Sequence, residues 1–418
     1  MSDDADRLGA GRYLAPAQVP DGTRTTAHEL TTHDGATVNG LLRVVPGATT
    51  VAFLMHPRQD FSHHVLVPEL LVRGVAVWTQ GARSLGNDLT LLHEQALLDM
   101  AAGHLFLRDR GFEHVVAIGH SGGATLAAFY LQQAGREPGS RLEATPGGKP
   151  VPLRDATMPP ADGLVMFAPH PGQGALLQRM IDPSVIDEAD PLSVDPDLDP
   201  YNPANGFAPP PESSSYAPEF IERYRQAQRA RIGRIDAVAW ERVNDSMTAR
   251  KRFKAHDDPR DRRASLATGV IVVHRTDADL RSVDLSIDPN DRPYGSLFGR
   301  RPDLTNYGVV GFGRLTTPEA WLSTWSANGT RADLSACAPD VNVPTLIVEL
   351  TGDQACFPAD ATRFAELLPH PDVTHVRIPG RHFGAPLHKG MVSGATLAGK
   401  EMAHWFGERF PIGPLISA

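Results

Sequence analysis

A serine between glycines is the first candidate for chemistry in this sequence. Ser121 stands in the pentapeptide Gly-His-Ser-Gly-Gly at positions 119–123, directly after the apolar run 115–118. A serine hydroxyl is a poor nucleophile, so catalysis requires a turn that exposes the oxygen, a base for its proton and donors for a developing oxyanion. The order of apolar run, glycine-flanked serine and helix-forming segment predicts such a turn at Ser121. An ordinary strand-to-helix turn is the alternative interpretation.

A histidine and an acid that could complete this chemistry lie more than 200 residues downstream. Asp353 follows the apolar run 343–350, and His382 follows the run 373–378. An imidazole can accept the serine proton, and a carboxylate can orient that imidazole and stabilise its protonated form. Because the carboxyl ends of parallel strands meet at one edge of a sheet, the three residues are predicted to lie together there.

The acid is the member of this set with the most alternatives. Asp353 could cap the helix predicted after Pro358, since aspartate is common at that position. Glu349 and Asp360 are weaker candidates for the same role. His382 could be a hydrogen-bonded loop histidine without a catalytic role.

Composition places the chain among globular proteins with a large core. Its 418 residues are 41% hydrophobic and 21% charged, and no apolar run approaches the roughly 18 residues of a membrane-spanning helix. A net charge of −9 argues against nucleic acid as a partner, because phosphate binding needs a basic face. Cys337 and Cys356 are too few for a disulfide framework. The acidic N-terminal stretch does not look like a secretory signal, so a cytoplasmic protein without membrane contact is expected.

The apolar runs predict alternating strands and helices. Continuous apolar runs are typical of strands buried on both faces of a parallel sheet, and apolar residues at helical spacing predict helices between them. The predicted strands are 50–55, 75–79, 115–120, 163–167, 343–350 and 373–378, after a hairpin at 26–32 and 37–45. The predicted helices are 65–73, 89–110, 124–134, 359–368 and 394–410.

The stretch from about residue 175 to 340 differs in composition from the rest. It is rich in Pro, Asp and Arg, with a basic amphipathic helix predicted at 218–243 and a candidate strand at 269–273. The arginines of that helix are predicted to face solvent: Arg223, Arg225, Arg229, Arg231 and Arg234. Because the strand pattern resumes beyond it, the stretch is interpreted as an insertion. The predicted organisation is an N-terminal arm at 1–24, a core at 25–174 and 341–418, and a cap insertion at 175–340.

These motifs resemble those of the α/β-hydrolase-fold serine hydrolases, which carry Ser, then Asp or Glu, then His in this order. The resemblance rests on the glycine-flanked serine, on the acid after the penultimate strand and on Pro-Gly-Arg-His at 379–382. It implies an α/β fold, with a mostly parallel, doubly wound sheet and a large, mainly helical cap between core strands 6 and 7. It also implies Ser121 as nucleophile, His382 as base and Asp353 as orienting acid. The spacing from Asp353 to Pro358 is one residue longer than the usual family pattern.

The resemblance further implies an oxyanion hole of two backbone N–H groups. The first is that of Gly122. The family usually has His-Gly-x after the third strand, whereas this chain has His56-Pro57-Arg58. Because proline has no N–H, Arg58 is expected to supply the second donor. Its side chain is interpreted either as a partner for an acidic substrate group or as a surface arginine.

Four further residues are candidates for substrate contact. Trp321 and Trp325 lie four apart in a helix-like stretch, where they could line an apolar pocket or pack the cap against the core. His56 and His170 each follow a predicted strand, and each could touch substrate or be structural. No metal-ligand pattern accompanies the histidines, so neither a metal nor an organic cofactor is expected.

The combination predicts a serine hydrolase that cleaves a carboxylic ester, or a related acyl bond, of a bulky and partly apolar small molecule through an acyl-enzyme. A lactonase, a thioesterase and a C–C bond hydrolase of a ring-cleavage-type diketone use the same triad and remain alternatives. A ligand receptor that keeps the fold is the non-enzyme alternative. A homodimer through the cap or the edge strand is compatible with the sequence.

Overall fold

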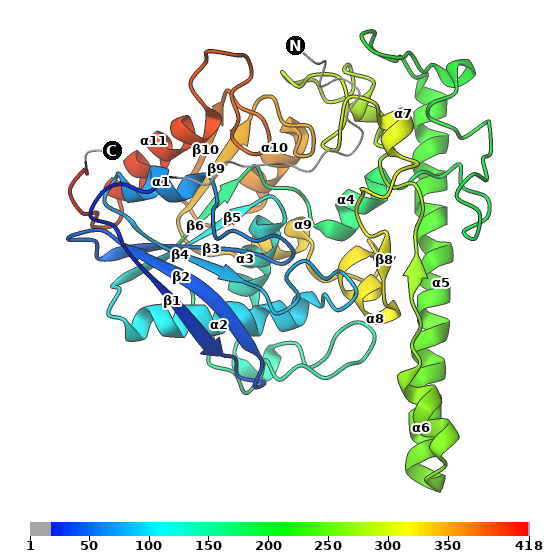
Figure 1. Cartoon of the computed structure of the whole chain (residues 1–418), viewed down its shortest axis with the longest axis horizontal. Coiled ribbons are helices and arrows are strands. Elements are labelled where there is room, and N and C mark those ends of the chain that lie inside the picture. The colour runs from blue at the N-terminus through cyan, green and yellow to red at the C-terminus, as the bar shows by residue number, and fades with distance from the viewer. Residues whose placement is uncertain (1–17, 417–418) are drawn as a thin grey trace.

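The central feature of the computed structural model, which describes residues 18–416, is an eight-stranded sheet (Figure 1). Its strand order is β1-β2-β4-β3-β5-β6-β9-β10. β2 runs antiparallel to β1 and to β4, and the other neighbouring strands are parallel. The strands are β1 (Arg24–Thr31), β2 (Thr37–Val44), β3 (Thr50–His56), β4 (Ala76–Gly81), β5 (His114–His120), β6 (Gly163–Phe167), β9 (Thr345–Leu350) and β10 (Val373–Ile378).

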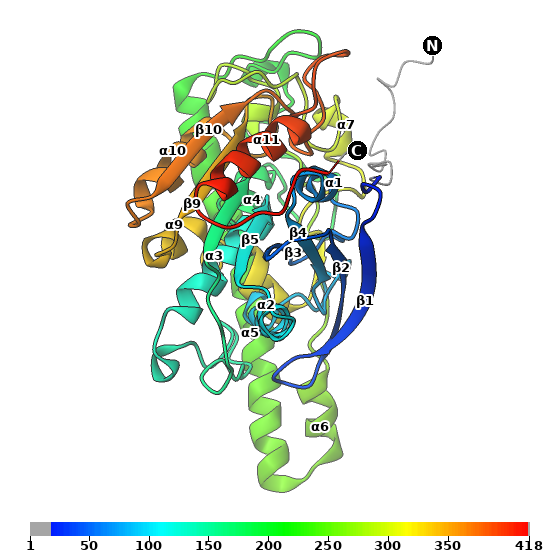
Figure 2. The same ribbon diagram turned by 90° about the vertical axis from the view of Figure 1, so that its left-hand side faces the viewer.

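Helices cover both faces of the sheet (Figure 2). Residues of α1 and α11 share one apolar core with the sheet, and residues of α2, α3 and α10 share another. The side chains of β3 alternate between these cores, with Phe53 in the core of α2 and Leu54 in that of α1. A strand covered on both faces needs apolar side chains at every position, which explains the continuous apolar run. These helices are α1 (Leu66–Leu71), α2 (His93–Asp109), α3 (Gly122–Ala134), α10 (Pro358–Leu367) and α11 (Gly394–Gly407).

The mostly parallel, doubly wound sheet predicted from the sequence is confirmed. Each predicted core strand and helix is present, with bounds that differ by a few residues. The helix predicted from residue 89 begins instead at His93, because the backbone of Leu92 is extended. The predicted arm at 1–24 lies largely outside the described residues, and its last residue, Arg24, begins β1.

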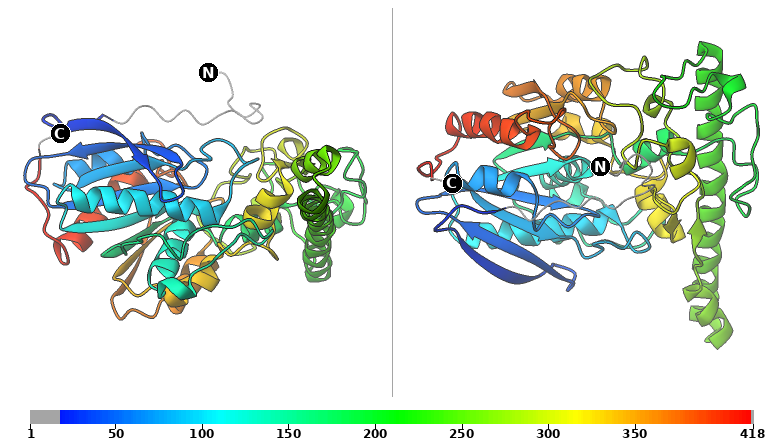
Figure 3. Two further views of the ribbon diagram at one scale, coloured as in Figure 1. Left: turned by 90° about the horizontal axis from the view of Figure 1, so that it is seen from below. Right: turned by 45° about the horizontal axis from the view of Figure 1, so that its top comes forward.

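Between β6 and β9, residues 168–344 form a segment that adds no strand to the eight-stranded sheet. We call it the intervening segment. It holds a two-stranded sheet and helices, of which α5 lies farthest from the main sheet (Figure 3). These elements are α4 (Gln173–Met180), α5 (Pro218–His256), α6 (Pro259–Leu266), β7 (Ile271–Val272), α7 (Pro302–Thr305), β8 (Leu315–Thr316), α8 (Pro318–Ala320) and α9 (Leu334–Cys337).

Helix α5 is longer than predicted. It spans 39 residues, whereas the amphipathic pattern predicted an end near Val243. The buried face does end near that residue, with Ala249 the one later residue of α5 that is buried. Beyond it the helix continues against α6, and Arg252 pairs with Asp261 across the two helices. Figure 2 shows these two helices extending past the rest of the molecule.

The arginines of α5 do not form one solvated face, which corrects the prediction. The Arg231 side chain is fully buried and donates to Glu188 and to the carbonyl oxygens of Asp182 and His274. Its partners come from parts of the chain that no helical periodicity can identify. Within residues 18–416, none of the helices combines the length and the apolar character needed to cross a bilayer.

Candidate active site

Ser121 lies at a sharp turn between β5 and α3, as the sequence predicted. Its backbone has φ 55° and ψ −121°, a strained conformation that non-glycine residues rarely adopt outside functional sites. A Cβ on Gly119 would lie 2.3 Å from Cα of Ala124, and one on Gly123 would lie 2.7 Å from the carbonyl oxygen of Met55. The two glycines therefore allow α3 to begin directly against the strands, which holds Ser121 at the carboxyl edge of the sheet.

Asp353 and His382 form a buried hydrogen-bonded pair on the loops after β9 and β10. Oδ2 of Asp353 lies 2.8 Å from Nδ1 of His382. The other oxygen, Oδ1, accepts the backbone N–H groups of Ala355 and Cys356 at 2.7 and 3.0 Å. The carboxylate is thus held with Oδ2 toward the imidazole. This assigns the proton of a neutral His382 to Nδ1 and leaves Nε2 as an acceptor.

The two weaker acid candidates are bonded elsewhere. Glu349 accepts from two side chains of β10, at 2.8 and 3.0 Å. Asp360 accepts from both terminal nitrogens of Arg179 in α4. Of the three carboxylates that the sequence left open, Asp353 is the one bonded to His382.

A chain of histidines connects the Ser121 turn to the His382 loop. His120 Nε2 donates to the carbonyl oxygen of His382 at 2.9 Å, and His120 Nδ1 accepts from Nε2 of His64 at 2.9 Å. Burial lowers the pKa of His64 to about 3 and that of His120 well below its usual value, so both rings are neutral. The chain holds the backbone of His382 beside the turn. The sequence does not reveal this role, because no motif identifies a histidine by the partner that it meets in the fold.

The N–H of Arg58, the expected second oxyanion donor, is bonded within its own loop. Nδ1 of His56 accepts this N–H and that of Gln59, each at 2.9 Å. The Arg58 guanidinium makes two bonds to Asp88, at 2.6 and 2.7 Å, and lies over the ring of Trp325 at 4.6 Å from its centre. Both expected uses of Arg58 therefore meet a competing partner, His56 for the N–H and Asp88 for the side chain.

His170 and Gln173 pack against Gly122, the residue that follows Ser121. A Cβ on Gly122 would lie 2.4 Å from Nε2 of Gln173 and 2.9 Å from Nε2 of His170. Burial, reinforced by the neighbouring His382, lowers the pKa of His170 to about 3. His170 is thus brought to the Ser121 turn. Gln173, the first residue of α4, was missed, because a glutamine after a Pro-Gly turn carries no catalytic signature.

The two tryptophans are fully buried in one apolar cluster with residues of α5, but their polar contacts differ. Trp325 is fully buried beneath the Arg58 guanidinium, which connects it to the loop after β3. Trp321 packs in an apolar cluster with residues of α5, and its Nε1 donates to Asp236 at 2.7 Å. Of the two, Trp325 is therefore the one that the structure brings near the site, and Trp321 holds α5 in place.

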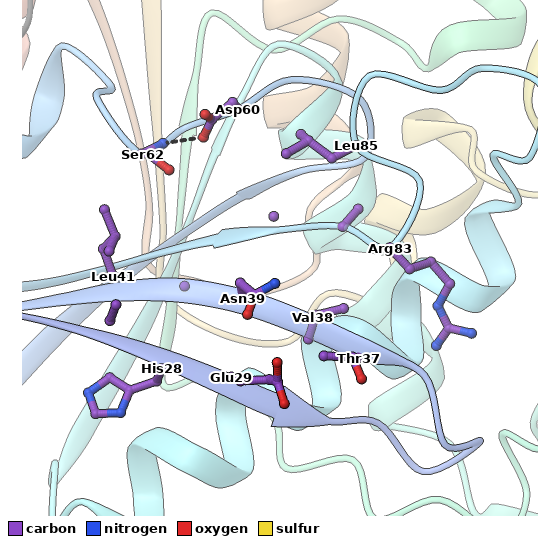
Figure 4. Close-up of a pocket in the computed structure, with 14 residues that line it drawn as sticks. His28, Glu29, Thr37, Val38, Asn39, Leu41, Asp60, Ser62, Arg83 and Leu85 are labelled. Carbon is purple, nitrogen blue, oxygen red and sulfur yellow. Dashed lines mark hydrogen bonds between the residues drawn. The ribbon is translucent and has the colours of Figure 1, made fainter.

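A surface hollow of about 590 Å³ has other residues in its walls (Figure 4). It is formed by β1, β2, the chain around residues 81–85, and Asp60 and Ser62 of the loop after β3. None of its lining residues is one of the predicted site residues. The candidate active site is therefore located by the Ser121 turn and the Asp353–His382 pair rather than by this hollow.

Cys356 joins Asp353 and His382 in a group close enough to share a cation. Its Sγ lies 2.8 Å from the carbonyl oxygen of Ala168, to which it donates. Burial, followed by the charge of Asp353, raises the pKa of this thiol well above its usual value. A neutral thiol bonded to a carbonyl is a poor metal ligand, so this group fits an acid–histidine pair better than a metal centre.

Three features coincide in this cluster: the strained serine after the fifth strand, the acid after β9 and the histidine after β10. The strand order and the position of these loops match the expected architecture. The protein has an α/β-hydrolase fold. The serine, the acid and the histidine occur in the chain order that the fold predicts, and each follows a strand of the sheet.

Comparison with known proteins finds no matching family model and no matching curated protein. Similar solved structures include the esterase domain of a Rhodothermus marinus protein, Est1E from Butyrivibrio proteoclasticus and an α/β fold family hydrolase from Bacillus anthracis. Their sequence identities are 11%, 12% and 10%, and their TM-scores are 0.42, 0.43 and 0.42. The alignments cover 92%, 91% and 92% of this chain and 98%, 98% and 99% of the others. These values are too low to transfer an activity, a substrate or a site residue.

Proposed function

We propose that this protein is a serine hydrolase that cleaves a carboxylic ester through an acyl-enzyme. Ser121 is the nucleophile, His382 the base and Asp353 the acid that orients it. The observation that carries the proposal is the strained Ser121 turn beside a buried Asp353–His382 pair. Backbone strain at a serine is rare unless it serves a site, and the pair leaves the imidazole with its acceptor nitrogen free for a hydroxyl proton.

The proposed reaction first acylates Ser121 and then hydrolyses the acyl-enzyme. The Ser121 oxygen attacks the ester carbonyl while Nε2 of His382 takes its proton, which gives a tetrahedral oxyanion and an imidazolium. The C–O bond of the leaving alcohol breaks, and the imidazolium returns the proton to that alcohol. Water then attacks the acyl-enzyme with His382 as base, and the acid is released as Ser121 recovers its proton.

The proposed substrate is the ester of a bulky, partly apolar small molecule. Support comes from the intervening segment, which brings Phe312 and, fully buried beneath the Arg58 guanidinium, Trp325 to the Arg58 side of the site. The partly exposed ring of Phe312 favours an apolar acyl or alcohol group beside it. The Arg58 charge is balanced by Asp88, so no free cation of that loop attracts an anionic substrate.

Covalent labelling tests the nucleophile. A fluorophosphonate is expected to label wild type at one site and to fail with Ser121→Ala. The matched control is Ser140→Ala, an exposed serine in the turn Pro138–Ser140, which is expected to label as wild type does. A folded wild-type protein that resists labelling would remove the enzymatic proposal and leave a ligand receptor.

Steady-state and burst kinetics test the bond. Hydrolysis of p-nitrophenyl esters of increasing acyl length is expected to show a burst equal to the enzyme concentration, which reports an acyl-enzyme. Activity is expected to survive dialysis against EDTA, because the proposed steps use no metal. Turnover of a vinylogous diketone without any ester hydrolysis would contradict the esterase and support a C–C bond hydrolase.

A further inference from the structure

The first three residues after β3, where the second oxyanion donor is expected, offer no unbonded backbone N–H. Pro57 has no N–H, and those of Arg58 and Gln59 are both donated to Nδ1 of His56. A tetrahedral oxyanion is stabilised by hydrogen-bond donors that already point at it. With a single backbone donor, one of the two expected hydrogen bonds to the oxyanion is missing. If Gly122 supplies the first donor, the second has to come from elsewhere.

His170 offers a side-chain donor on the side of Gly122. Its Nδ1 accepts the N–H of Gly172 at 2.9 Å. A neutral imidazole carries one proton, so this bond assigns the proton to Nε2, the atom that packs against Gly122. The backbone of His170 is itself held, because its carbonyl oxygen accepts from the Thr125 hydroxyl of α3 at 3.0 Å. The ring is thus fixed relative to the helix that begins after Ser121.

We propose that Nε2–H of His170 is the second donor of the oxyanion hole, in place of the backbone N–H of Arg58. This inference rests on the proposed serine hydrolase function. In the attack step the ester carbonyl oxygen becomes the oxyanion, and Gly122 N–H and His170 Nε2–H donate to it. His170 keeps its proton throughout, so the reaction gains a hydrogen bond without another proton transfer.

Gln173 is the competing donor, because its Nε2 also packs against Gly122. The two side chains differ in how they are held. The carbonyl oxygen of the Gln173 side chain is buried without a hydrogen bond of ordinary length, and its neighbouring polar group is the ring of His93. His170 is held at Nδ1 by Gly172. Preorganisation therefore favours His170, and Gln173→Leu becomes the comparison that can overturn the choice.

The test uses three substitutions at constant ester substrate. His170→Leu removes the donor, and kcat is expected to fall about 100- to 1,000-fold with KM changed less than about threefold. His170→Gln keeps a nitrogen donor at a similar reach and is expected to recover at least about tenfold of that loss. His104→Leu is the matched control, a fully buried histidine in α2 that stacks on Tyr130, and is expected to keep kcat within about threefold.

A transition-state analogue separates a donor from a structural residue. The affinity for an alkyl trifluoromethyl ketone is expected to fall in His170→Leu by the same factor as kcat/KM, because the bound hemiketal carries the oxyanion. Where His170→Leu does not fold, the imidazole N–H resonance of wild-type His170 is followed by NMR, and it is expected to move when the analogue binds.

The outcomes distinguish this inference from the proposed function. Activity retained in Ser121→Ala would overturn both. Loss of activity in Ser121→Ala, with kcat retained in His170→Leu or an unmoved imidazole resonance, would overturn the role of His170 alone. Loss of kcat in Gln173→Leu but not in His170→Leu would assign the donor to Gln173 instead.

Discussion

Replacing Asp353 by asparagine tests the most specific feature of the site, the orientation of its acid. Oδ1 accepts two backbone N–H groups, those of Ala355 and Cys356, so this position requires an acceptor atom. In Asp353→Asn the amide oxygen is expected to take that position, which turns the amide nitrogen toward Nδ1 of His382. An N–H donor facing Nδ1 forces the imidazole into the other tautomer, with its proton on Nε2.

In this tautomer His382 has no free acceptor nitrogen toward Ser121. Nε2 of His382 then carries a proton and cannot take that of Ser121. The same substitution in a serine protease triad lowers kcat about 10⁴-fold, which corresponds to about 5.5 kcal/mol of transition-state stabilisation. We expect a loss of similar size here, with little change in thermal stability, because the side chain keeps its shape and its bonds to Ala355 and Cys356, and its bond to His382 is reversed in direction but not lost.

Glu349→Gln is the matched control for this experiment. Glu349 lies on the adjacent strand β9 and is bonded to His375 and Arg377, and the Arg377 side chain is 57% exposed. Loss of these pairs is expected to cost at most about 1 kcal/mol of stability and to leave kcat within about twofold. Both variants are assayed with one p-nitrophenyl ester and by thermal unfolding. An Asp353→Asn enzyme within tenfold of wild type, or an inactive and folded Glu349→Gln, would refute the assignment of the acid.

Three further results are expected. Burial raises the pKa of Glu94 from 4.5 to about 7, so its charge destabilises the fold increasingly from pH 4.5 to 7. In urea unfolding at pH 8, Glu94→Gln should therefore be more stable than wild type by about 3 kcal/mol, and this difference should disappear near pH 4.5. Equal stabilities at pH 8 would contradict the raised pKa. In thermal unfolding, Gly119→Ala should lower the free energy of unfolding by about 3 kcal/mol or more, because the added Cβ would clash with the backbone of α3. The control Gly139→Ala has open space around the added Cβ and should change this free energy by at most about 0.5 kcal/mol. The pH profile of kcat/KM above about pH 5 should have the same shape in wild type and in His170→Gln, because burial lowers the pKa of His170 to about 3 and keeps this ring neutral throughout that range. A limb that His170→Gln removes would contradict this account.

The core of the fold was predictable because its central strands are apolar at nearly every position. β3 and β5 contact helices on both faces, so nearly all of their positions are apolar and the run stands out in the sequence. The Ser121 turn was predictable for a related reason. The close approach of α3 excludes a side chain at Gly119 and Gly123, and that restriction is visible as glycine.

The intervening segment was not predictable in the same way, because polar contacts between distant residues hold much of it together. Asp182 pairs with Arg275, and its other contacts include the amide of Asn306. Residues so far apart in the chain leave no periodic pattern. Arg231 shows the consequence, since a charged residue on a helix predicts a solvated face unless its partner is known.

The structure brings some of the predicted site residues together and gives others competing partners, for a physical reason. Asp353 and His382 follow strands, so the topology of the sheet alone brings them together. The N–H of Arg58 depends on a local choice, because a histidine two residues earlier can accept it through its side chain. In the sequence, Pro57 is the visible departure from the family pattern. The bonds that His56 accepts from Arg58 and Gln59 are visible only in the structure.

The buried histidines near His382 are neutral, and this affects the charge that develops in the proposed reaction. Burial lowers the pKa of His56 and of His170, and the charge of Arg58 is matched by Asp88. In the proposed reaction His382 becomes positively charged as the oxyanion forms, and a second cation beside it would oppose that step. Neutral imidazoles remove this opposition and still carry an N–H to donate. The burial that would penalise charged histidines therefore lets several imidazoles surround the proposed base, His382.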